Sequence, residues 1–264
     1  MDLSRYIRQM TFSGLGVKGQ EILRDSNVAI MGAGGLGSVI SEHLCRAGIG
    51  KITLADCDVA DITNLHRQFL YTEEDVRLKR PKASASAAHL AEINSDVVIT
   101  PVVTVIDASN IEELIKDAHV VIDATDNFDT RALIGEACQK HKKPWIYGAA
   151  LASSGAVMNI FPNGSSSPNG SLLPQGGPCF RCLIHDIPER GTYPTCKDEG
   201  VISMLTVTVA SLQTAEAMKI LIGSPDVSRK YLDIDVWMNN FEYVEISPDP
   251  NCRLCVREEY EFLG

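Results

Sequence analysis

Two pairs of closely spaced cysteines carry the most specific chemistry in this sequence. Cys179 and Cys182 form one C-x-x-C pair, and Cys252 and Cys255 form a second. Together they offer four thiolates, which complete a tetrahedral Zn²⁺ shell and leave no open position for catalysis. We therefore predict one structural zinc ion per chain, which requires the fold to bring the two pairs together; redox-active dithiols are the alternative.

A glycine-rich segment at residues 32–37 (GAGGLG) is a candidate phosphate-binding turn. It follows the apolar run 28–31 and precedes residues at helical spacing, so a turn from strand to helix is expected. Backbone N–H groups in such a turn can approach a phosphate, and the helix N-terminus favours negative charge. Asp56 ends the next apolar run, where an acid accepts hydrogen bonds from a ribose. The segment predicts nucleotide binding in preference to a purely structural glycine turn.

Cationic residues near this segment indicate which nucleotide it binds. Arg67 and Lys82 follow Asp56 along the chain, and Arg5 and Arg8 precede the first expected strand. A nicotinamide dinucleotide carries only a pyrophosphate, whereas a triphosphate needs more positive charge as pyrophosphate leaves. Arg67 and Lys82 therefore favour a triphosphate, while Arg5 is expected to be a solvated surface charge.

An acidic turn follows the buried run 120–122. Asp126 comes after this expected strand, and the carboxyl ends of strands form the ligand edge of a doubly wound sheet. Asp126 could hold Mg²⁺ between phosphate oxygens, because Mg²⁺ typically uses one or two carboxylates plus phosphate. Asp126 or Asn127 could instead, or in addition, cap the following helix.

The other cysteines have less defined chemistry. Cys196 lies in a loop-like segment, where Lys197 favours a thiolate and two acidic residues oppose it, so a reactive and a structural role both stay open. Cys45 and Cys138 fall in helical patterns and are expected in the core, and Cys57 is also expected to be a packing residue.

The elements that must position these residues alternate between strands and helices. Strands are predicted at 28–31, 52–56, 97–103, 120–122 and 145–147, and helices at 36–47, 83–93, 110–115 and 131–141. This order is typical of a Rossmann-like α/β fold, with a doubly wound, mostly parallel sheet covered on both faces. Beyond it we expect a mobile, poorly ordered loop at 163–178, a long buried helix at 202–221 and an antiparallel pair at 231–236 and 241–246.

Size and charge limit the class of protein. The 264 residues suit one domain, 1–264, with a nucleotide-binding half at 1–150 and a second half at 151–264 that contains both cysteine pairs. There are 24 Lys plus Arg against 34 Asp plus Glu, and the net charge of −10 argues against a general nucleic-acid binder. No membrane-spanning run or secretory signal is expected, so the predicted location is the cytoplasm, where cysteines stay reduced.

Together these segments resemble the ThiF/MoeB/HesA family, the prokaryotic relatives of ubiquitin-activating enzymes. The resemblance covers nearly the whole chain and rests on Arg5-Tyr6-x-Arg8-Gln9, the glycine segment, residues 64–68 (NLHRQ), residues 124–127 (ATDN), both cysteine pairs, and residues 210–213 (ASLQ) with Glu216-Ala217-x-Lys219. It implies ATP-dependent adenylation of the C-terminal glycine carboxylate of a ubiquitin-like sulfur carrier of the ThiS or MoaD type. Pyrophosphate would be released, and the sulfur would serve thiamine or molybdenum cofactor biosynthesis.

The resemblance also implies roles for individual residues. The ATP-binding residues would be Gly34, Gly35, Asp56, Asn64, Arg67, Lys82, Asp126 and Asn127, and the catalytic residues Asp126, Arg67, Arg8 and Cys196. Asp126 would assist Mg²⁺ and in-line transfer, and the half 151–264 would bind the carrier. Arg8 resembles an arginine that reaches the ATP of a neighbouring subunit, which implies a homodimer. Cys196 matches the position that, in the thiamine branch, bonds covalently to the carrier tail.

Some features depart from the family pattern. The loop 163–178 is longer than expected, near where a carrier tail would enter, and Ala156 stands where glutamine is expected. Both leave the identity of the carrier open. The chain after Cys255 is too short for a rhodanese-like domain, so a separate cysteine desulfurase or rhodanese is expected to supply sulfur. The alternatives are adenylation of a small-molecule or RNA-linked carboxylate, a non-enzymatic nucleotide-binding scaffold, and an NAD(P)-dependent oxidoreductase.

Overall fold

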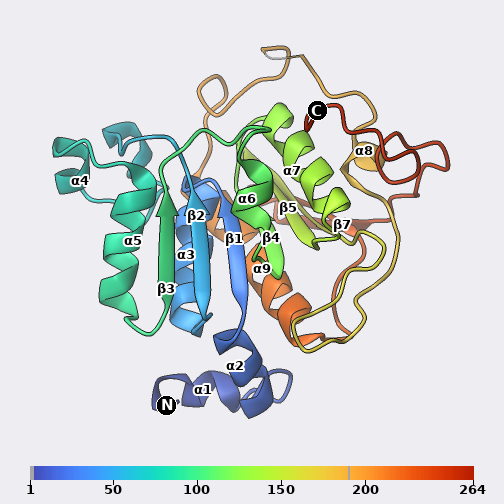
Figure 1. Ribbon diagram of the computed structural model, residues 1–264. Coiled ribbons are helices and arrows are strands. Elements are labelled where there is room, and N and C mark those ends of the chain that lie inside the picture. The colour runs from blue at the N-terminus through green and yellow to red at the C-terminus, as the bar shows by residue number, and fades with distance from the viewer. Residues whose placement is uncertain (1–2, 190) are drawn as a thin grey trace.

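The computed structural model describes residues 3–189 and 191–264, and one mixed sheet runs through the middle of this part of the chain (Figure 1). Its eight strands have the order β3-β2-β1-β4-β5-β6-β7-β8. They are β1 (Asn27–Met31), β2 (Lys51–Ala55), β3 (Val98–Val102), β4 (Val120–Asp123), β5 (Trp145–Leu151), β6 (Ser154–Ile160), β7 (Tyr231–Asp235) and β8 (Asn240–Val244). The first five strands are parallel, as predicted, and the last three pair antiparallel.

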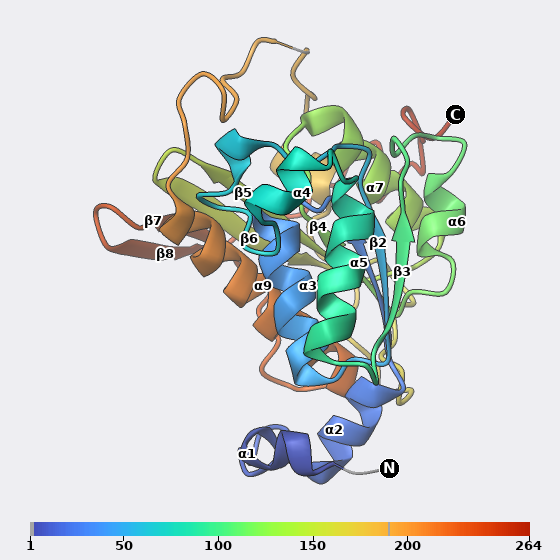
Figure 2. The ribbon, with the colours of Figure 1, turned by 90° about the vertical axis from the view of Figure 1, so that its left-hand side faces the viewer.

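Helices cover both faces of the sheet. They are α1 (Ile7–Met10), α2 (Gly16–Arg24), α3 (Gly35–Ala47), α4 (Glu73–Arg77), α5 (Lys82–Ile93), α6 (Ile111–Ile115), α7 (Phe128–Lys140), α8 (Phe180–Leu183) and α9 (Ser203–Ile222), with short 3₁₀ turns at Ser4–Tyr6 and Ile62–Asn64. Figure 2 shows the layers: α3, α5 and α9 lie on one side of the strands, and α6 and α7 on the other. The predicted Rossmann-like arrangement is therefore confirmed.

Strand β1 explains why the core divides into two layers. Its residues from Val28 to Met31 are all buried. Successive side chains of a strand point to opposite faces. Val28 and Ile30 pack into the core beneath α3 and α9, whereas Ala29 and Met31 pack into the core beneath α6 and α7. A continuous apolar run is thus what a parallel strand covered on both faces requires.

The antiparallel half begins with β6, a strand that the sequence did not predict. β6 pairs with β5 along seven residues, and β7 and β8 then extend the sheet as a hairpin. The predicted strand pair at 231–236 and 241–246 corresponds to β7 and β8. Ala156, which stands where the family pattern has glutamine, is buried in β6 opposite Ala149.

Helix α9 has the length and hydropathy of a membrane span, but it is a core helix here. Leu205, Val209 and Leu221 are fully buried, and the helix packs against α3, β5 and β6. Gln213, one of several buried polar residues in α9, donates a hydrogen bond to the carbonyl of Asp123 at 2.7 Å. Gly223, with φ +68°, ends the helix in a left-handed cap.

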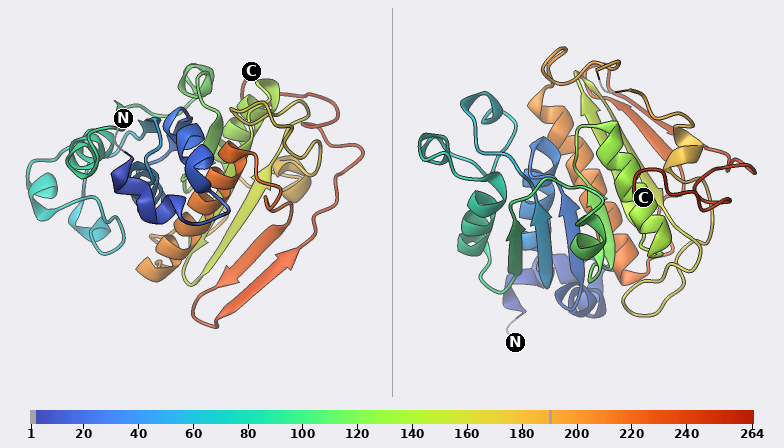
Figure 3. Two further views of the ribbon diagram at one scale, coloured as in Figure 1. Left: turned by 90° about the horizontal axis from the view of Figure 1, so that it is seen from below. Right: turned by 45° about the horizontal axis from the view of Figure 1, so that its top comes forward.

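The N-terminal helices lie across the amino ends of the strands, at the bottom of Figure 1 and nearest the viewer in the left view of Figure 3. Tyr6 is buried against Gly48, and its hydroxyl accepts a hydrogen bond from Asn94 at 2.8 Å. Gln9 and Gln20 both donate to the carbonyl of Ala47. The segment Arg5-Tyr6-x-Arg8-Gln9 therefore fastens the N-terminus to the end of α3.

The segment 163–178 has more internal structure than its composition predicts. Gly164 N–H donates to the Gln175 side chain at 2.6 Å, and Asn169 donates to the carbonyl of Ile222 at the C-terminal end of α9. A helix of 20 residues is about 30 Å long, and the other end of α9 lies beside the glycine turn. The loop 163–178 therefore lies at the opposite end of α9 from the glycine turn.

A buried carboxylate fixes the segment that leads into α5. Asp75 is part of the capping box of α4 and also accepts hydrogen bonds from Arg80 at 2.8 Å and His89 at 2.9 Å. Burial alone would raise the pKa of Asp75, but these hydrogen bonds and those from Thr72 together lower it to about 2.

The Asp75→Asn variant should be about 2 kcal/mol less stable than the wild type near neutral pH. In the wild type, folding lowers the pKa of the Asp75 carboxyl from its ordinary value of 3.8 to about 2, and the variant lacks this carboxyl. A lowered pKa means that the ionised group stabilises the fold above about pH 4 and loses this effect as the pH falls towards 2. Urea unfolding at several pH values should show a steeper acid loss for the wild type than for Asp75→Asn. The exposed Glu92→Gln variant is the control, and parallel curves for wild type and Asp75→Asn would contradict the assignment.

Candidate functional site

The glycine turn joins β1 to α3, and its glycines have two different tasks. A Cβ atom on Gly32, whose φ is +103°, would lie 2.6 Å from the carbonyl oxygen of Ala124, and one on Gly37 would lie 1.9 Å from that of Gly32. These two glycines permit close backbone packing. Gly34 and Gly35 face Gln68, Arg67 and Thr206 instead. No side chain within the described ranges caps the first turn of α3, so its N–H groups can serve an anion.

Asp56 follows β2 and rests on the glycine turn. One carboxylate oxygen accepts the N–H of Ala33 at 2.6 Å, and the other accepts the N–H of Asp58 at 2.7 Å. Burial raises the pKa of Asp56, and the two N–H groups oppose that shift. The carboxylate is therefore held beside the turn, at the position predicted for a ribose acid.

The predicted cations reach the same edge from two segments. Arg67 is half-buried, its side chain passes over Gly35, and it donates to the carbonyl of Thr63 at 3.1 Å. The carbonyl of Asn64 accepts N–H groups from Arg67 and Gln68, which shapes this segment. Lys82 begins α5 with little exposure.

Lys82 is held by Asp58 in two ways. Its Nζ lies 2.9 Å from the Asp58 carboxylate, and its backbone N–H donates to the Asp58 carbonyl at 2.8 Å. An incoming phosphate would therefore compete with Asp58 for this ammonium group.

The β4–α7 turn separates the roles of two neighbouring residues. The side chain of Asn127 accepts the N–H of Thr130 at 2.9 Å and is the N-cap of α7. Asp126 is exposed and does not cap the helix. Because Ala124 packs on Gly32, the turn that contains Asp126 lies directly beside the glycine turn. Asp126 is thus left available for a cation or a ligand.

Cys196 lies in the loop between α8 and α9, which arches over the carboxyl end of the sheet at the top of Figure 1. The thiol is half-buried and donates to the carbonyl of Ala150 at 3.6 Å. Burial raises the pKa of Cys196; the positive charge of Arg67 lowers it, and the negative charge of Asp126 raises it. These electrostatic contributions place the thiol in the same region as the other candidate residues, mainly in its protonated form near neutral pH.

The sequence analysis missed a buried ion pair beneath this edge. Arg131 of α7 lies 3.3 Å from the carboxylate of Asp123, the last residue of β4, and both side chains are almost completely buried. Burial raises the pKa of Asp123, and the charge of Arg131 opposes that shift. The available signal was Asp123 directly after the apolar run 120–122, but an exposed or helix-capping aspartate would have produced the same pattern.

One predicted catalytic residue is not part of this cluster. Arg8 is exposed on α1, across the amino ends of the strands, whereas Gly35, Asp56 and Asp126 lie at the carboxyl ends (Figure 1). Within a single chain, Arg8 therefore does not reach the glycine turn.

The four paired cysteines come together on the α7 face of the sheet. Their sulfur atoms all lie within 4.8 Å of one another. The Sγ atoms of Cys179 and Cys182 are 3.8 Å apart, those of Cys179 and Cys252 3.5 Å, and those of Cys182 and Cys255 3.6 Å. Hydrogen bonds from neighbouring thiols lower the pKa of Cys182, and the N–H of Asp249 also donates to its sulfur at 3.4 Å. This arrangement can hold a metal ion.

The remaining cysteines were predicted to pack in the core, and this is correct for two of them. Cys45 and Cys138 are fully buried, and burial raises the pKa of Cys45 to about 11. The expectation for Cys57 is wrong, because this residue is exposed beside Asp56. The chain turns outward after β2, since both oxygens of Asp56 are committed to backbone N–H groups.

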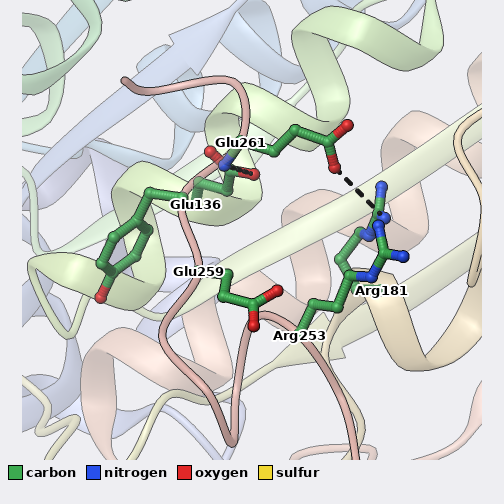
Figure 4. A pocket seen from close by; sticks show the side chains of 6 residues that line it. Glu136, Arg181, Arg253, Glu259 and Glu261 are labelled. Carbon is green, nitrogen blue, oxygen red and sulfur yellow. Dashed lines mark hydrogen bonds and ion pairs between the residues drawn. The ribbon is translucent and has the colours of Figure 1, made fainter.

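A pocket of about 240 Å³ lies where α7, α8 and the C-terminal tail meet. Figure 4 shows the side chains that line it: Glu136, Arg181, Arg253, Glu259, Tyr260 and Glu261. The buried carboxylate of Glu136 accepts the N–H groups of Glu261, Phe262 and Leu263 at 2.8–2.9 Å. The C-terminal tail is thereby fixed to α7.

Comparison with known proteins gives a consistent assignment. Residues 6–254 match the family model described as the ThiF family. The sulfur carrier protein ThiS adenylyltransferase of Bacillus subtilis is 37% identical over 262 residues, which cover 98% of this chain and 74% of that protein. The molybdopterin-synthase adenylyltransferase of Escherichia coli is 34% identical over 255 residues, or 96% of each chain. Among solved structures, E. coli MccB with ATP aligns with a TM-score of 0.79 and 21% identity, covering 96% of this chain and 75% of that one.

The fold and site define a class of α/β proteins in which a glycine turn, an acid after the second strand and an exposed acid after the fourth strand meet at one sheet edge. The family match covers most of the chain. The chain belongs to the ThiF family.

Proposed function

We propose that this protein is an adenylyltransferase that uses ATP to adenylate the C-terminal glycine carboxylate of a ubiquitin-like sulfur carrier protein. The observation that carries the proposal is the meeting of the glycine turn, the cations Arg67 and Lys82, and the exposed carboxylate of Asp126 at one sheet edge. The names of two relatives support it: the B. subtilis protein is a sulfur carrier protein ThiS adenylyltransferase, and the E. coli protein is a molybdopterin-synthase adenylyltransferase.

In this proposal the carrier carboxylate attacks the α-phosphorus of ATP. A new bond forms between a carboxylate oxygen and phosphorus, the bond from that phosphorus to the bridging oxygen breaks, and pyrophosphate leaves with the electron pair. The N–H groups at Gly34 and Gly35 bind phosphate, and Asp56 accepts hydrogen bonds from the ribose. Arg67 stabilises the charge that develops, and Lys82 exchanges Asp58 for a phosphate oxygen.

Asp126 is the proposed ligand for Mg²⁺ bound with ATP. Its carboxylate is exposed, and Asn127 performs the capping that would otherwise occupy it. Hard oxygen donors suit Mg²⁺, which would neutralise phosphate charge when bound. Asn64 and Asn127 complete the proposed set around the nucleotide, with their backbone segments held by hydrogen bonds on either side of the glycine turn.

A homodimer would complete the site with Arg8. Because Arg8 lies at the amino ends of its own strands, it can act on ATP only in a second copy of the chain. Two observations support this pairing: Phe12 and Val17 expose more than half of their surfaces near Arg8, and Ile62 and Phe69 do the same near the nucleotide edge. Apolar surfaces of this kind mark protein–protein contacts.

The carrier is proposed to bind to the half 151–264. Strand β8 is an edge strand, all five of its residues are exposed, and Trp237 at the β7–β8 turn and Phe241 add apolar surface. Cys196 belongs to this half, its thiol lies within the electrostatic influence of Asp126, and it is the proposed nucleophile if the carrier follows the thiamine-type route. Sulfur would come from a separate donor protein, a cysteine desulfurase or a rhodanese.

The cysteine cluster is proposed to hold one structural zinc ion. Zn–S bonds of about 2.3 Å in a tetrahedron place sulfur atoms about 3.8 Å apart, and the three distances given above are 3.5–3.8 Å. When bound, zinc would cross-link the loop before α8 to the C-terminal tail. The reduced thiols that this requires fit the cytoplasmic location expected from the sequence.

Pyrophosphate exchange into ATP, measured with a carrier ending in Gly-Gly, tests the adenylation step. Arg67→Ala should lower the exchange rate by about 10²–10³, because it removes a charge-stabilising donor. Asp126→Ala should also lower the rate and raise the Mg²⁺ requirement. Asp117→Ala, at the amino end of β4, is the matched control. Wild-type exchange by Asp126→Ala would disprove its role, and exchange stimulated by small acids but not by carriers would favour the small-molecule alternative.

Elemental analysis tests the metal site. We expect one zinc ion per chain in the wild type and in Cys196→Ala, and loss of zinc in Cys179→Ala, because three thiolates hold the ion more weakly than four. A full zinc content in Cys179→Ala would refute the assignment. Exchange activity that persists in the metal-free protein would agree with a structural role.

Mass spectrometry tests the role of Cys196. With ATP, carrier and sulfur donor present, a covalent complex of enzyme and carrier should form in the wild type and be absent in Cys196→Ser. Cys57→Ser, which alters another thiol near the nucleotide edge, is the control. Sustained turnover without any adduct would show that the adenylate is passed on without this thiol.

A further inference from the structure

The ion pair between Asp123 and Arg131 surrounds a single residue, Thr125. Asp123 accepts the N–H of Thr125 at 2.9 Å and its hydroxyl at 2.6 Å. Arg131 accounts for the remaining polar group, because its Nη2 donates to the carbonyl of Thr125 at 2.8 Å. Every polar atom of Thr125 is therefore bound by this pair. Thr125 immediately precedes Asp126.

The pair also joins this turn to the next strand. The same Nη2 atom of Arg131 lies 3.3 Å from the carbonyl of Gly148 in β5. The guanidinium lies over the rings of both Phe128 and Tyr147, with its carbon 5.6 Å and 5.3 Å from their centroids. Packing of this kind restricts the guanidinium to one orientation, so the turn before Asp126 cannot move independently of β4, β5 and α7.

Stability alone is a poor explanation for this arrangement. Burying two charges costs several kcal/mol for each ion, and replacing a buried pair with apolar residues is often neutral or stabilising. The contact within the pair is also not ideal, because Arg131 Nε and Asp123 Oδ2 face each other at 3.3 Å without forming a well-aligned hydrogen bond. Costly buried groups are concentrated at functional sites. The electrostatic influence of Arg131 also reaches both Asp126 and Cys196.

We propose that Arg131 and Asp123 are positioning residues, which hold Asp126 in the geometry that the adenylation step requires. This proposal rests on the proposed function and adds a device to it. Arg131 binds the carbonyl of Thr125 and Asp123 binds its N–H. The backbone of the turn that contains Asp126 is therefore held by buried side chains, while the Asp126 carboxylate itself is exposed. The exposed Asp126 then needs no direct contact of its own to keep its place.

The proposal predicts a change in turnover rather than in nucleotide affinity. Arg131→Met keeps an unbranched apolar side chain in the core but removes the guanidinium, which releases the Thr125 carbonyl. A displacement of about 1 Å at a reacting group can cost about 10²-fold in rate. We expect kcat for pyrophosphate exchange to fall by about that factor, KM for ATP to change little, and half-saturation by Mg²⁺ to require a several-fold higher concentration.

Conservative variants separate positioning from simple support of the fold. Arg131→Lys keeps the charge and should restore part of the rate. Asp123→Asn combined with Arg131→Met should be about as slow as Arg131→Met alone, because both residues act on one turn. Thr125→Val, which removes only the hydroxyl, should fold normally and show a smaller shift in the same direction. Arg181→Met removes another buried guanidinium and should leave the Mg²⁺ dependence unchanged.

The experiment combines exchange kinetics with calorimetric binding of ATP over a range of Mg²⁺ concentrations, and melting curves monitor the fold. Wild-type Mg²⁺ dependence and kcat in a folded Arg131→Met would overturn the proposal. If Arg131→Met fails to fold, Thr125→Val decides, and unchanged Mg²⁺ dependence there would overturn it equally. If the wild type binds MgATP but exchanges no pyrophosphate with any carrier, the proposed function fails, while the effect of Arg131→Met on the Mg²⁺ dependence of ATP binding still tests the positioning role.

Discussion

The whole candidate site depends on one contact between two pieces of backbone. A side chain on Gly32 would lie 2.6 Å from the carbonyl oxygen of Ala124, so only glycine lets the turn after β1 pack directly on the turn after β4. This approach brings the N-terminus of α3 next to Asp126. Asp56, at the end of β2, is held beside the same turn because its carboxylate accepts the N–H of Ala33. Larger residues at these positions would separate the glycine turn from the turn that contains Asp126.

The parallel and antiparallel halves of the sheet have different roles in the structure. The parallel half concentrates strand termini, helix N-termini and charged groups at one edge, as doubly wound sheets generally do. The antiparallel half supplies an open edge strand, β8, and the face on which the cysteines assemble. Helix α9 links the halves: it packs against α3 on one side and against β5 and β6 on the other, while Gln213 reaches the end of β4. The two halves of the sheet are therefore joined through one shared helix.

Local signals were sufficient for the features that local geometry controls. The glycine turn, Asp56 and the five parallel strands could be predicted because spacing, chain flexibility and apolar runs specify them directly. The two C-x-x-C pairs could also be recognised from their spacing, although it is the fold that brings the Sγ atoms of Cys179 and Cys252 to 3.5 Å from each other. Strand β6 was not predicted, because its small and apolar residues follow β5 closely and could equally have belonged to one continuous segment with it.

Features controlled by long-range packing could not be read in this way. The sequence offered Asp126 and Asn127 equally as helix caps, and one hydrogen bond from Thr130 decides between them. The burial of Arg131 depends on Tyr147 and Gly148 from another strand, and the position of the loop 163–178 depends on the far end of α9.

The hydrogen bonds between Glu136 and residues 261–263 have a practical consequence for the design of fusion proteins. Three N–H groups hold the tail against α7, so the C-terminus has a fixed place at the end of the sheet where the strand arrowheads point (Figure 1). A second protein joined after Gly264 by a short flexible linker would be tethered near the nucleotide edge at an effective concentration on the order of millimolar. Tethering through the N-terminus would start from the opposite end of the sheet and would need a linker long enough to pass around the molecule.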